Sequence, residues 1–288
     1  MSEVAVETTG KRGPWLLMAY PSIMIGIFFL IPFSLIVAVS VAHQLPEGYY
    51  QPGLELTHYS RFLSPVFINT AIFSVSVSAL VACICLLLGF PFTYFITRLR
   101  RRYQVMWLVY ILAQLSLSEV LIAFSWQVLL SRTAGFTNIL AWLGIIERSF
   151  SLYPSFGAVI IALTYLVLPF SVLILYPPMS RLDSEITEAS RTLGASPLRT
   201  FFSVVIPILR PAIVATGITM FVFTLGAVLI PQVLGRPQHW TLSVLITDQA
   251  IFQSNLPFAA ALAIFLLVFS MGLVGLTIWI NRRYGEVS

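Results

Sequence analysis

Residues 153–179 read Tyr-Pro-Ser-Phe-Gly-Ala-Val-Ile-Ile-Ala-Leu-Thr-Tyr-Leu-Val-Leu-Pro-Phe-Ser-Val-Leu-Ile-Leu-Tyr-Pro-Pro-Met, without one charged side chain. About 20 apolar residues, rising 1.5 Å each, are enough for a helix to cross a bilayer. This stretch therefore predicts a membrane-spanning helix. The composition agrees, because 58% of the 288 residues are hydrophobic and only 9% are charged. Soluble domains carry about a quarter charged residues, so a water-soluble globule is excluded.

Five further apolar stretches are long enough to cross a bilayer as helices. Several contain prolines, so we expect tilts and kinks. Six crossings place both termini on one side. The sequence predicts an all-α polytopic membrane protein with one transmembrane domain over residues 1–288, in which residues 1–14 form a tail. The six predicted spans are Trp15–Val41, Val66–Ile96, Val105–Leu130, Tyr153–Met179, Pro211–Gly235 and Pro257–Ile280.

The distribution of charge predicts the orientation, since Lys and Arg concentrate in cytoplasmic segments. Twelve of the 16 basic residues fall in the N-terminus, the loops 97–104 and 180–210, and the C-terminus. Both termini are therefore predicted to be cytoplasmic. The external segments are 42–65, 131–152, which contains a short helix candidate at Ile139–Ile146, and 239–256. The basic residues lie between spans rather than on one face, so the net charge of +5 does not indicate nucleic-acid binding.

The cytoplasmic loop 180–210 divides into two short helices. Asp183 is a predicted N-cap, and Gly194 is a predicted helix stop. Ser196 is predicted to cap a second helix that starts at Pro197.

In the second helix of this loop, Leu198, Phe201, Phe202 and Val205 recur at helical spacing, which predicts one apolar face, and Pro207 is expected to end the helix. Such a pair lies on the lipid surface or binds in a groove of a partner protein, and periodicity alone leaves both open.

The same loop carries a longer pattern. Glu188-Ala189-Ser190, then Gly194 after three residues, and Val204-Val205-Ile206-Pro207 after nine more, resemble the EAA loop of the inner-membrane permeases of binding-protein-dependent ABC importers. The resemblance is greatest to spermidine/putrescine-type permeases. Stretches that carry it elsewhere are Leu168–Phe170, Leu193–Pro197, Phe223–Ala227 and the pair Asp248-Gln249.

This resemblance implies a type I ABC importer permease with a MetI-like architecture in the bacterial inner membrane. The loop would be a coupling helix seated in a cytoplasmic ATPase. Glu188 would contact the ATPase, Ala189 would permit close packing, Gly194 would make the turn, and Pro207 would start the return to the membrane. Leu198 and Phe201 would belong to the same coupling surface.

The implied partners are a second permease subunit, two ATP-binding cassette subunits, an extracytoplasmic solute-binding protein and the lipid bilayer. The implied cargo is a polyamine.

The chain is not expected to hydrolyse ATP itself. A P-loop needs a Gly-Lys-Ser/Thr sequence, and the only lysine is Lys11 in the N-terminal tail, so ATP and Mg²⁺ should bind a partner ATPase. No His-Glu-x-x-His or Gly-x-Ser-x-Gly motif is present. The scattered histidines, with Cys83 and Cys85 two apart in an apolar run, indicate neither a metal site nor a disulfide. We therefore expect a transport subunit rather than an enzyme.

Glu119 is the only charged residue inside a predicted span, near the middle of Val105–Leu130, with Gln127 in the same span. A carboxylate there is costly unless it faces a cavity or a partner group. It could attract a cationic substrate, or it could be protonated or hydrogen-bonded to a neighbouring helix or to the second permease. Ile122 occupies a position where spermidine/putrescine-type permeases often carry arginine.

Two further residues are substrate-path candidates. Asp248, in the last external loop, could face the substrate or the binding protein, or it could be a solvated or capping aspartate. Trp126 could bind an ammonium group on its ring face, although a tryptophan near the outer boundary is more often an interfacial anchor.

Three other functions compete with polyamine import. The cargo could be an opine, an amino-acid derivative or another organic cation. The chain could be a self-contained channel or secondary transporter, which usually needs several intramembrane polar groups. An intramembrane hydrolase is the third, and no partner for Glu119 in catalysis is visible in the sequence.

Overall fold

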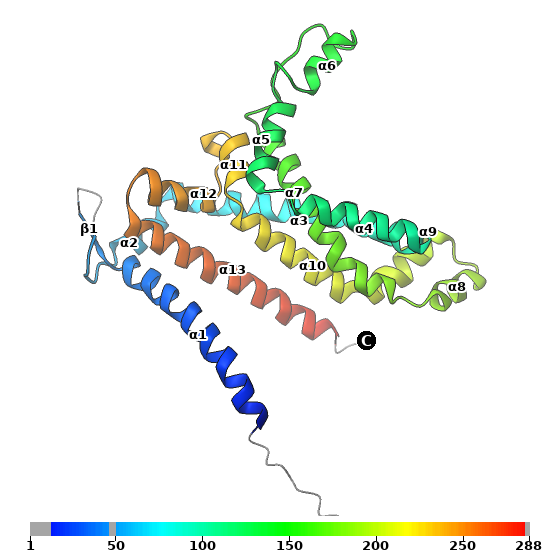
Figure 1. The fold of residues 1–288 in the computed structure, drawn as a ribbon, viewed down its shortest axis with the longest axis horizontal. Coiled ribbons are helices and arrows are strands. Elements are labelled where there is room, and N and C mark those ends of the chain that lie inside the picture. The colour runs from blue at the N-terminus through cyan, green and yellow to red at the C-terminus, as the bar shows by residue number, and fades with distance from the viewer. Residues whose placement is uncertain (1–12, 46–49, 286–288) are drawn as a thin grey trace, which may run out of the picture.

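The computed structural model describes residues 13–45 and 50–285, and its regular structure is almost entirely helical (Figure 1). One antiparallel hairpin pairs His43 with Gln51 and Gln44 with Tyr50. The elements in chain order are α1 (Gly13–Ser40), β1 (His43–Gln44), β2 (Tyr50–Gln51), α2 (Thr57–Ser60), η1 (Arg61–Leu63), α3 (Pro65–Arg98), α4 (Arg101–Leu115), α5 (Glu119–Leu129), α6 (Phe136–Trp142), α7 (Phe156–Ser180), α8 (Ser184–Thr192), α9 (Pro197–Thr200), η2 (Phe201–Val205), α10 (Ile206–Gly226), α11 (Leu229–Leu234), η3 (Pro237–His239), α12 (Leu242–Thr247), η4 (Asp248–Phe252) and α13 (Leu256–Gly285).

The protein is an all-α polytopic membrane protein. Within the described residues, five helices are long and apolar enough to cross a membrane, and a bent pair, α4 with α5, makes up to six. The predicted spans 66–96, 153–179 and 257–280 correspond to α3, α7 and α13. Helix α1 begins at Gly13, so the predicted tail of residues 1–14 is too long by two residues, and residues 1–12 lie outside the described residues.

The third predicted span, Val105–Leu130, is wrong as a single helix. Helices α4 and α5 meet at a bend of 93°. Ser118 caps the new helix by accepting a hydrogen bond from the Val120 amide at 3.3 Å, and Glu119 occupies its first turn. A carboxylate is favourable at this positive helix end, so local capping replaces a continuous helix. Glu119 therefore lies at a helix start and not in the middle of a straight span.

The fifth predicted span, Pro211–Gly235, is displaced. One continuous run of helix covers residues 197–226, and the chain then breaks before α11. Pro207 does not end the preceding helix as predicted, because the wide π-helical turn Phe201–Val205 comes directly before it. Such a turn accommodates the amide that proline lacks and the bulk of its ring.

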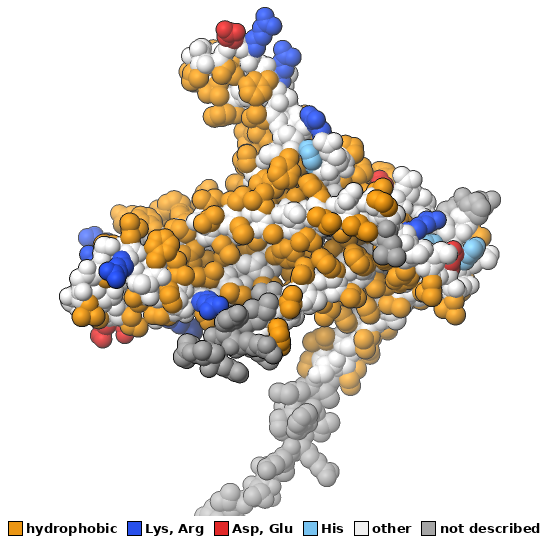
Figure 2. All heavy atoms as spheres, turned by 180° about the vertical axis from the view of Figure 1, so that it is seen from behind, with side chains coloured by type: hydrophobic (Ala, Val, Ile, Leu, Met, Phe, Trp, Pro, Cys, Tyr) orange, Lys and Arg blue, Asp and Glu red, His pale blue; other side chains and the backbone are white. Residues whose placement is uncertain are grey.

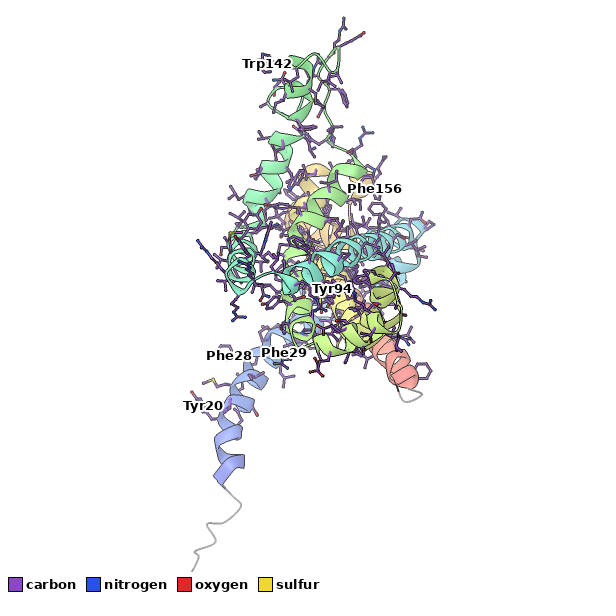
Figure 3. All side chains as sticks on the ribbon, turned by 90° about the vertical axis from the view of Figure 1, so that its right-hand side faces the viewer. Tyr20, Phe28, Phe29, Tyr94, Trp142 and Phe156 are labelled. Carbon is purple, nitrogen blue, oxygen red and sulfur yellow. The ribbon has the colours of Figure 1, made fainter. Side chains whose placement is uncertain are left out.

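Helix α7 lies at the centre of the bundle. More than half of the residues in its most apolar stretch are buried, whereas none of those in the corresponding stretch of α1 are. Helices α3 and α7 approach closely where Gly89 faces Ser171, since a Cβ on Gly89 would overlap the Ser171 side chain. Helix α1 packs on α13 near its C-terminal end and diverges from the bundle (Figure 1). Tyr20, Phe28 and Phe29 lie on this helix (Figure 3) and are exposed.

The external helix lies earlier than predicted: α6 covers Phe136–Trp142, whereas the expectation was Ile139–Ile146. Its N-terminal part is held by the Thr137 hydroxyl, which donates to the carbonyl of Phe150 at 2.6 Å, so the helix begins before the apolar run. The hairpin that carries α6 projects from the bundle, with Trp142 near its tip (Figures 1 and 3).

The long sides of the bundle are largely apolar. Figure 2 shows hydrophobic side chains over most of the surface, with Arg side chains gathered at the end that carries α8 and α9 and on the projecting hairpin. This distribution is that of a helix bundle surrounded by lipid, with its charged ends in water.

Candidate coupling surface and transport cavity

The cytoplasmic loop folds as the predicted helix pair. The Asp183 side chain accepts a hydrogen bond from the Glu185 amide at 3.0 Å and begins α8. Ser196 accepts one from the Arg199 amide at 3.3 Å and begins α9, with Pro197 in its first turn. Both predicted N-caps are confirmed. We call residues 183–202 the elbow.

Gly194 makes the turn between the two helices. Its φ is +89°, a conformation that L-residues with a Cβ rarely adopt. A Cβ placed there would meet nothing within 4 Å, so the requirement for glycine is one of backbone conformation and not of space. The predicted helix stop is confirmed.

The two helices of the elbow are joined by their side chains. The hydroxyls of Ser190 and Thr200 lie 3.1 Å apart, and Thr200 and Thr187 are buried. Glu188 and Ala189 are exposed on the outer side of α8. The elbow thus presents these two residues at one end of the bundle from a joined pair of helices.

The predicted single apolar face of the second helix is divided. Phe201 and Val205 pack inward against Phe90, and the Phe90 and Phe201 ring centroids are 5.4 Å apart. Leu198 and Phe202, four residues apart on the other side, are 72% and 64% exposed. The division follows the helical period, because positions four apart share a side. Leu198 and Phe202 are thus the uncovered apolar side chains of the second helix of the elbow.

Pro207 is exposed at the start of α10, within the continuous helix that joins the elbow to the bundle. The EAA-like residues therefore occupy two places: Glu188, Ala189 and Gly194 lie at the tip of the elbow, and Pro207 lies at its junction with the bundle.

A cavity of about 610 Å³ lies between the start of α5 and the helices α7, α10 and α13. Glu119 is its only charged lining residue, and its Oε1 atom is buried without a hydrogen-bond partner among the described residues. The remaining lining is Leu166, Val167, Phe170, Ile218, Thr219, Val222, Phe223, Gly226, Ala227 and Val274.

Two aromatic rings lie in the same cavity wall. Phe170 of α7 and Phe223 of α10 stack with their centroids 4.5 Å apart and an interplanar angle of 22°. A carboxylate with a free oxygen attracts a cation, and aromatic faces stabilise an ammonium group. The cavity therefore has the chemistry of an organic-cation site.

The other substrate-path candidates do not line this cavity. Trp126 packs edge-on against Tyr165, with ring centroids 5.7 Å apart, and contacts the hydrophobic core. Gln127 is half-buried further along α5. Ile122, where the related permeases often carry arginine, is buried in the core.

Asp248 lies apart from Glu119. It follows α12 at the start of the π-helical turn η4, where its backbone carbonyl accepts a hydrogen bond from the Gln253 amide at 3.0 Å. Its side chain is half-buried and does not line the cavity.

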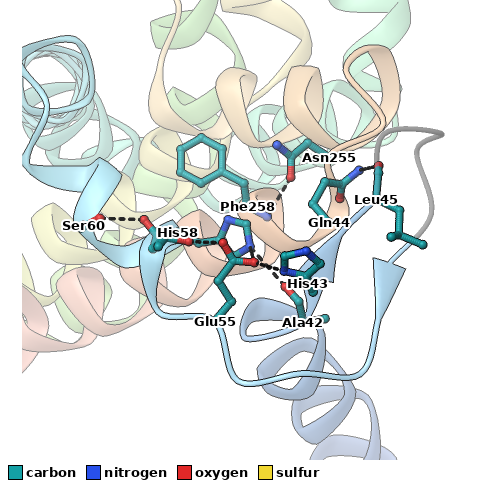
Figure 4. A network of polar contacts seen from close by, with 10 residues as sticks. Ala42, His43, Gln44, Leu45, Glu55, His58, Ser60, Asn255 and Phe258 are labelled. Atoms are coloured by element: carbon teal, nitrogen blue, oxygen red, sulfur yellow. Dashed lines mark hydrogen bonds and ion pairs between the residues drawn. The ribbon is translucent and has the colours of Figure 1, made fainter.

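One polar network was not predicted from the sequence. His43 Nδ1 lies 2.6 Å from Glu55 Oε2, and buried His58 Nε2 lies 3.9 Å from the same oxygen (Figure 4). A hydrogen bond from Thr57, followed by the contact with His43, lowers the pKa of Glu55 below its ordinary 4.5. His43 lies in the β1–β2 hairpin, and Glu55 and His58 follow it in the chain. Their spacing matches no known motif, so this network could be found only from the folded structure. No group of three or more metal-binding side chains occurs in the described part of the chain.

The family is decided by comparison with known sequences. The profile of the family described as "Binding-protein-dependent transport system inner membrane component" matches residues 89–286, more than half of the chain. The chain belongs to this family. The match covers the elbow, the cavity helices α7 and α10, and α13. The protein is thus a permease subunit of an ABC importer.

Curated relatives of this importer permease include the spermidine/putrescine transport system permease PotB of Escherichia coli K12, 28% identical over 257 residues, covering 89% of this chain and 93% of the relative. PotB of Haemophilus influenzae is 28% identical over 260 residues, covering 90% of each. The xylose/arabinose import permease XacH of Haloferax volcanii is 27% identical over 250 residues, covering 81% and 76%. The sequence resemblance to spermidine/putrescine-type permeases is confirmed.

Solved structures confirm the fold of the importer permease. A bacterial ABC transporter that imports the acidic polysaccharide alginate superimposes with a TM-score of 0.72 at 19% identity, covering 93% of this chain and 96% of that chain. The alginate transporter in complex with a periplasmic protein bound to an alginate pentasaccharide gives 0.71 at 19% identity, covering 94% and 95%.

Proposed function

We propose that this permease subunit carries a polyamine-type organic cation across the bacterial inner membrane. It forms the pathway together with a second permease subunit. An extracytoplasmic binding protein delivers the solute, and two separate ATP-binding cassette subunits supply the energy. The PotB relatives, named for spermidine and putrescine, support this cargo.

The observation that carries the proposal is the cavity at Glu119. A buried carboxylate oxygen without a partner is costly, and an ammonium group of the solute would supply both charge and hydrogen bonds. The stacked pair Phe170 and Phe223 borders the same space and suits the methylene chain and the cationic end of a polyamine. A sugar offers neither charge nor ammonium hydrogens, so the chemistry of the cavity favours a cation over the cargo named for the Haloferax relative.

The elbow is the proposed contact with the ATPase. Glu188 is exposed for a polar contact, Ala189 lets the partner approach closely, and Leu198 supplies an uncovered apolar side chain. Gly194 sets the angle between the two helices, and Pro207 stands where the elbow joins α10. Phe201 packs against the bundle, so motion of the elbow would pass through it to Phe90 on α3. Such contacts transmit ATP binding only if they differ between the two states of the ATPase.

The structure gives less support for substrate contacts at Asp248, Gln127 and Trp126 than at Glu119. Asp248 and Gln127 carry half-buried polar side chains outside the cavity, and Trp126 has one ring contact with Tyr165. We assign them to the path between the outer surface and Glu119 only if their substitution changes the KM for the solute.

The test is solute uptake by the complete importer reconstituted in vesicles, with Glu119→Gln as the variant. Loss of one ion pair to the solute should lower spermidine or putrescine uptake at least about tenfold, which corresponds to ~1.4 kcal/mol. Glu147→Gln removes an exposed external carboxylate and serves as the matched control. Unchanged uptake by Glu119→Gln would remove the cavity from the pathway, whereas an equal loss in both variants would show a general charge effect.

A further inference from the structure

The turn between α3 and α4 carries four exposed arginines within five residues: Arg98, Arg100, Arg101 and Arg102. We call residues 98–102 the arginine turn. In the described part of the chain, none of these arginines makes an ion pair with a carboxylate. The described acids of the predicted cytoplasmic side, Asp183, Glu185 and Glu188, all belong to the elbow. Four neighbouring positive charges without a carboxylate partner create a local positive potential, so the turn attracts an anion from outside the chain.

The backbone of the arginine turn is held by hydrogen bonds. The Gln104 side-chain amide donates hydrogen bonds to the carbonyls of Thr97 at 3.1 Å and Leu99 at 2.8 Å. Its amide oxygen accepts a hydrogen bond from the Tyr176 hydroxyl of α7 at 2.9 Å. These bonds constrain the backbone that carries the arginines, so the four side chains start from neighbouring positions before any ligand arrives. Preorganisation of this kind strengthens binding by reducing the ordering cost.

The position of the turn indicates what the anion is. The helices on either side expose apolar side chains immediately next to it: Phe95 of α3 is 57% exposed, and Met106 and Tyr110 of α4 are 55% and 61% exposed. Such side chains face acyl chains in a membrane. The arginines therefore lie at the level of the lipid headgroups, and basic clusters directly cytoplasmic of a membrane helix attract anionic headgroups. Arginine also binds phosphate oxygens in a bidentate geometry.

We propose that the arginine turn binds the phosphate headgroup of an anionic phospholipid of the cytoplasmic leaflet. The proposal does not depend on the cargo or on the ATPase. The lipid would lie close to the elbow, because the Arg98 guanidinium carbon is 5.0 Å from the centroid of the Tyr94 ring, and Tyr94 contacts Phe201 edge-on at 5.3 Å. One aromatic side chain thus separates the headgroup site from the elbow.

The test measures lipid binding directly. The complete importer is reconstituted in bilayers of phosphatidylcholine and phosphatidylglycerol mixed about four to one, extracted in mild detergent, and the retained lipids are quantified by mass spectrometry. We expect phosphatidylglycerol to be retained in excess over its share of the bilayer. The triple variant Arg100→Gln, Arg101→Gln, Arg102→Gln should reduce that excess at least about tenfold, since each basic residue near the surface adds attraction. The triple change to Lys keeps the charge and should retain part of the excess.

The control is Arg132→Gln with Arg148→Gln, which removes exposed positive charge from the projecting hairpin and should leave the excess unchanged. An excess that survives in the triple Gln variant would overturn the proposal. Loss of the ATPase subunits from that variant in pure phosphatidylcholine would also overturn it, because the arginines would then bind protein. If the triple variant fails to insert, the wild-type measurement decides, and retention at the bulk lipid ratio would contradict the proposal. The readout needs no transport, so it stays valid even if the proposed cargo is wrong.

Discussion

The hydroxyl groups of Ser190 and Thr200 lie 3.1 Å apart and join the two helices of the elbow. Thr200 is 3% exposed, so the contact is shielded from water. A hydrogen bond of this kind is worth about 1 kcal/mol and fixes how α9 lies against α8. The surface that the elbow offers to a partner therefore depends on this contact.

Ser190→Ala should loosen the elbow. We expect solute-stimulated ATP hydrolysis by the reconstituted importer to fall several-fold while unstimulated hydrolysis persists, because the coupling and not the ATPase is altered. Thr192→Ala is the matched control, since among the described residues the Thr192 hydroxyl bonds within its own helix, to the carbonyl of Ala189 at 2.8 Å. Equal behaviour of the two variants would count against the elbow as a coupling element.

Gly194→Val should impair transport through backbone strain. A β-branched residue at a φ of +89° costs roughly 1–2 kcal/mol, so the turn would populate its native conformation about tenfold less. Association with the ATPase should weaken accordingly in a pull-down titration. Gly144→Val is a close control, because Gly144 has a φ of +72° in open space on the projecting hairpin. Weakened ATPase binding in both would mean that general destabilisation, and not the elbow, explains the effect.

Phe223→Leu should weaken the binding of a cationic solute in the cavity. The change keeps an apolar side chain but removes the ring that stacks on Phe170, and a cation over an aromatic face is worth ~0.5–2 kcal/mol. We expect the KM for polyamine uptake to rise about threefold to tenfold, with Phe223→Tyr remaining close to wild type. A KM that follows side-chain volume alone would argue against a cation at this position.

Acid should destabilise the β1–β2 hairpin and the segment after it by protonating Glu55. Its pKa is lowered in the folded state, so its contribution to stability is complete above the ordinary value of 4.5 and is lost as the pH falls through the lowered value. The midpoint temperature of thermal unfolding should fall as the pH is lowered from about 6 to about 3. It should fall less in the Glu55→Gln variant than in the wild type. Intrinsic fluorescence of the detergent-solubilised protein reports this midpoint. The exposed Glu147→Gln variant should follow the wild type.

The sequence predicted most of the helices because the bilayer demands long apolar runs, and these are visible without the fold. It also predicted the caps of the elbow, since Asp183 and Ser196 act on amides two or three residues away. These are local effects, and local sequence is enough to reveal them.

The break before α5 was missed, although the pair Ser118-Glu119 is a helix-start signal inside an apolar run. The apolar run continues on both sides of this pair, so its length alone predicts one helix. Proline predicts a helix end at Pro207, but the π-helical turn Phe201–Val205 allows the helix to continue. The stacking of Phe170 on Phe223, 53 positions apart, and the contact of His43 with Glu55 depend on tertiary packing and could not be predicted.

The central claim is that this chain moves its solute only when a separate ATPase drives it. The most direct measurement compares spermidine uptake into vesicles that contain the two permease subunits, the binding protein and ATP, with and without the ATP-binding cassette subunits. The account predicts accumulation against a gradient only when the cassette subunits are present. Uptake of equal rate and extent without them would contradict it and would make the chain part of a self-contained channel or secondary transporter.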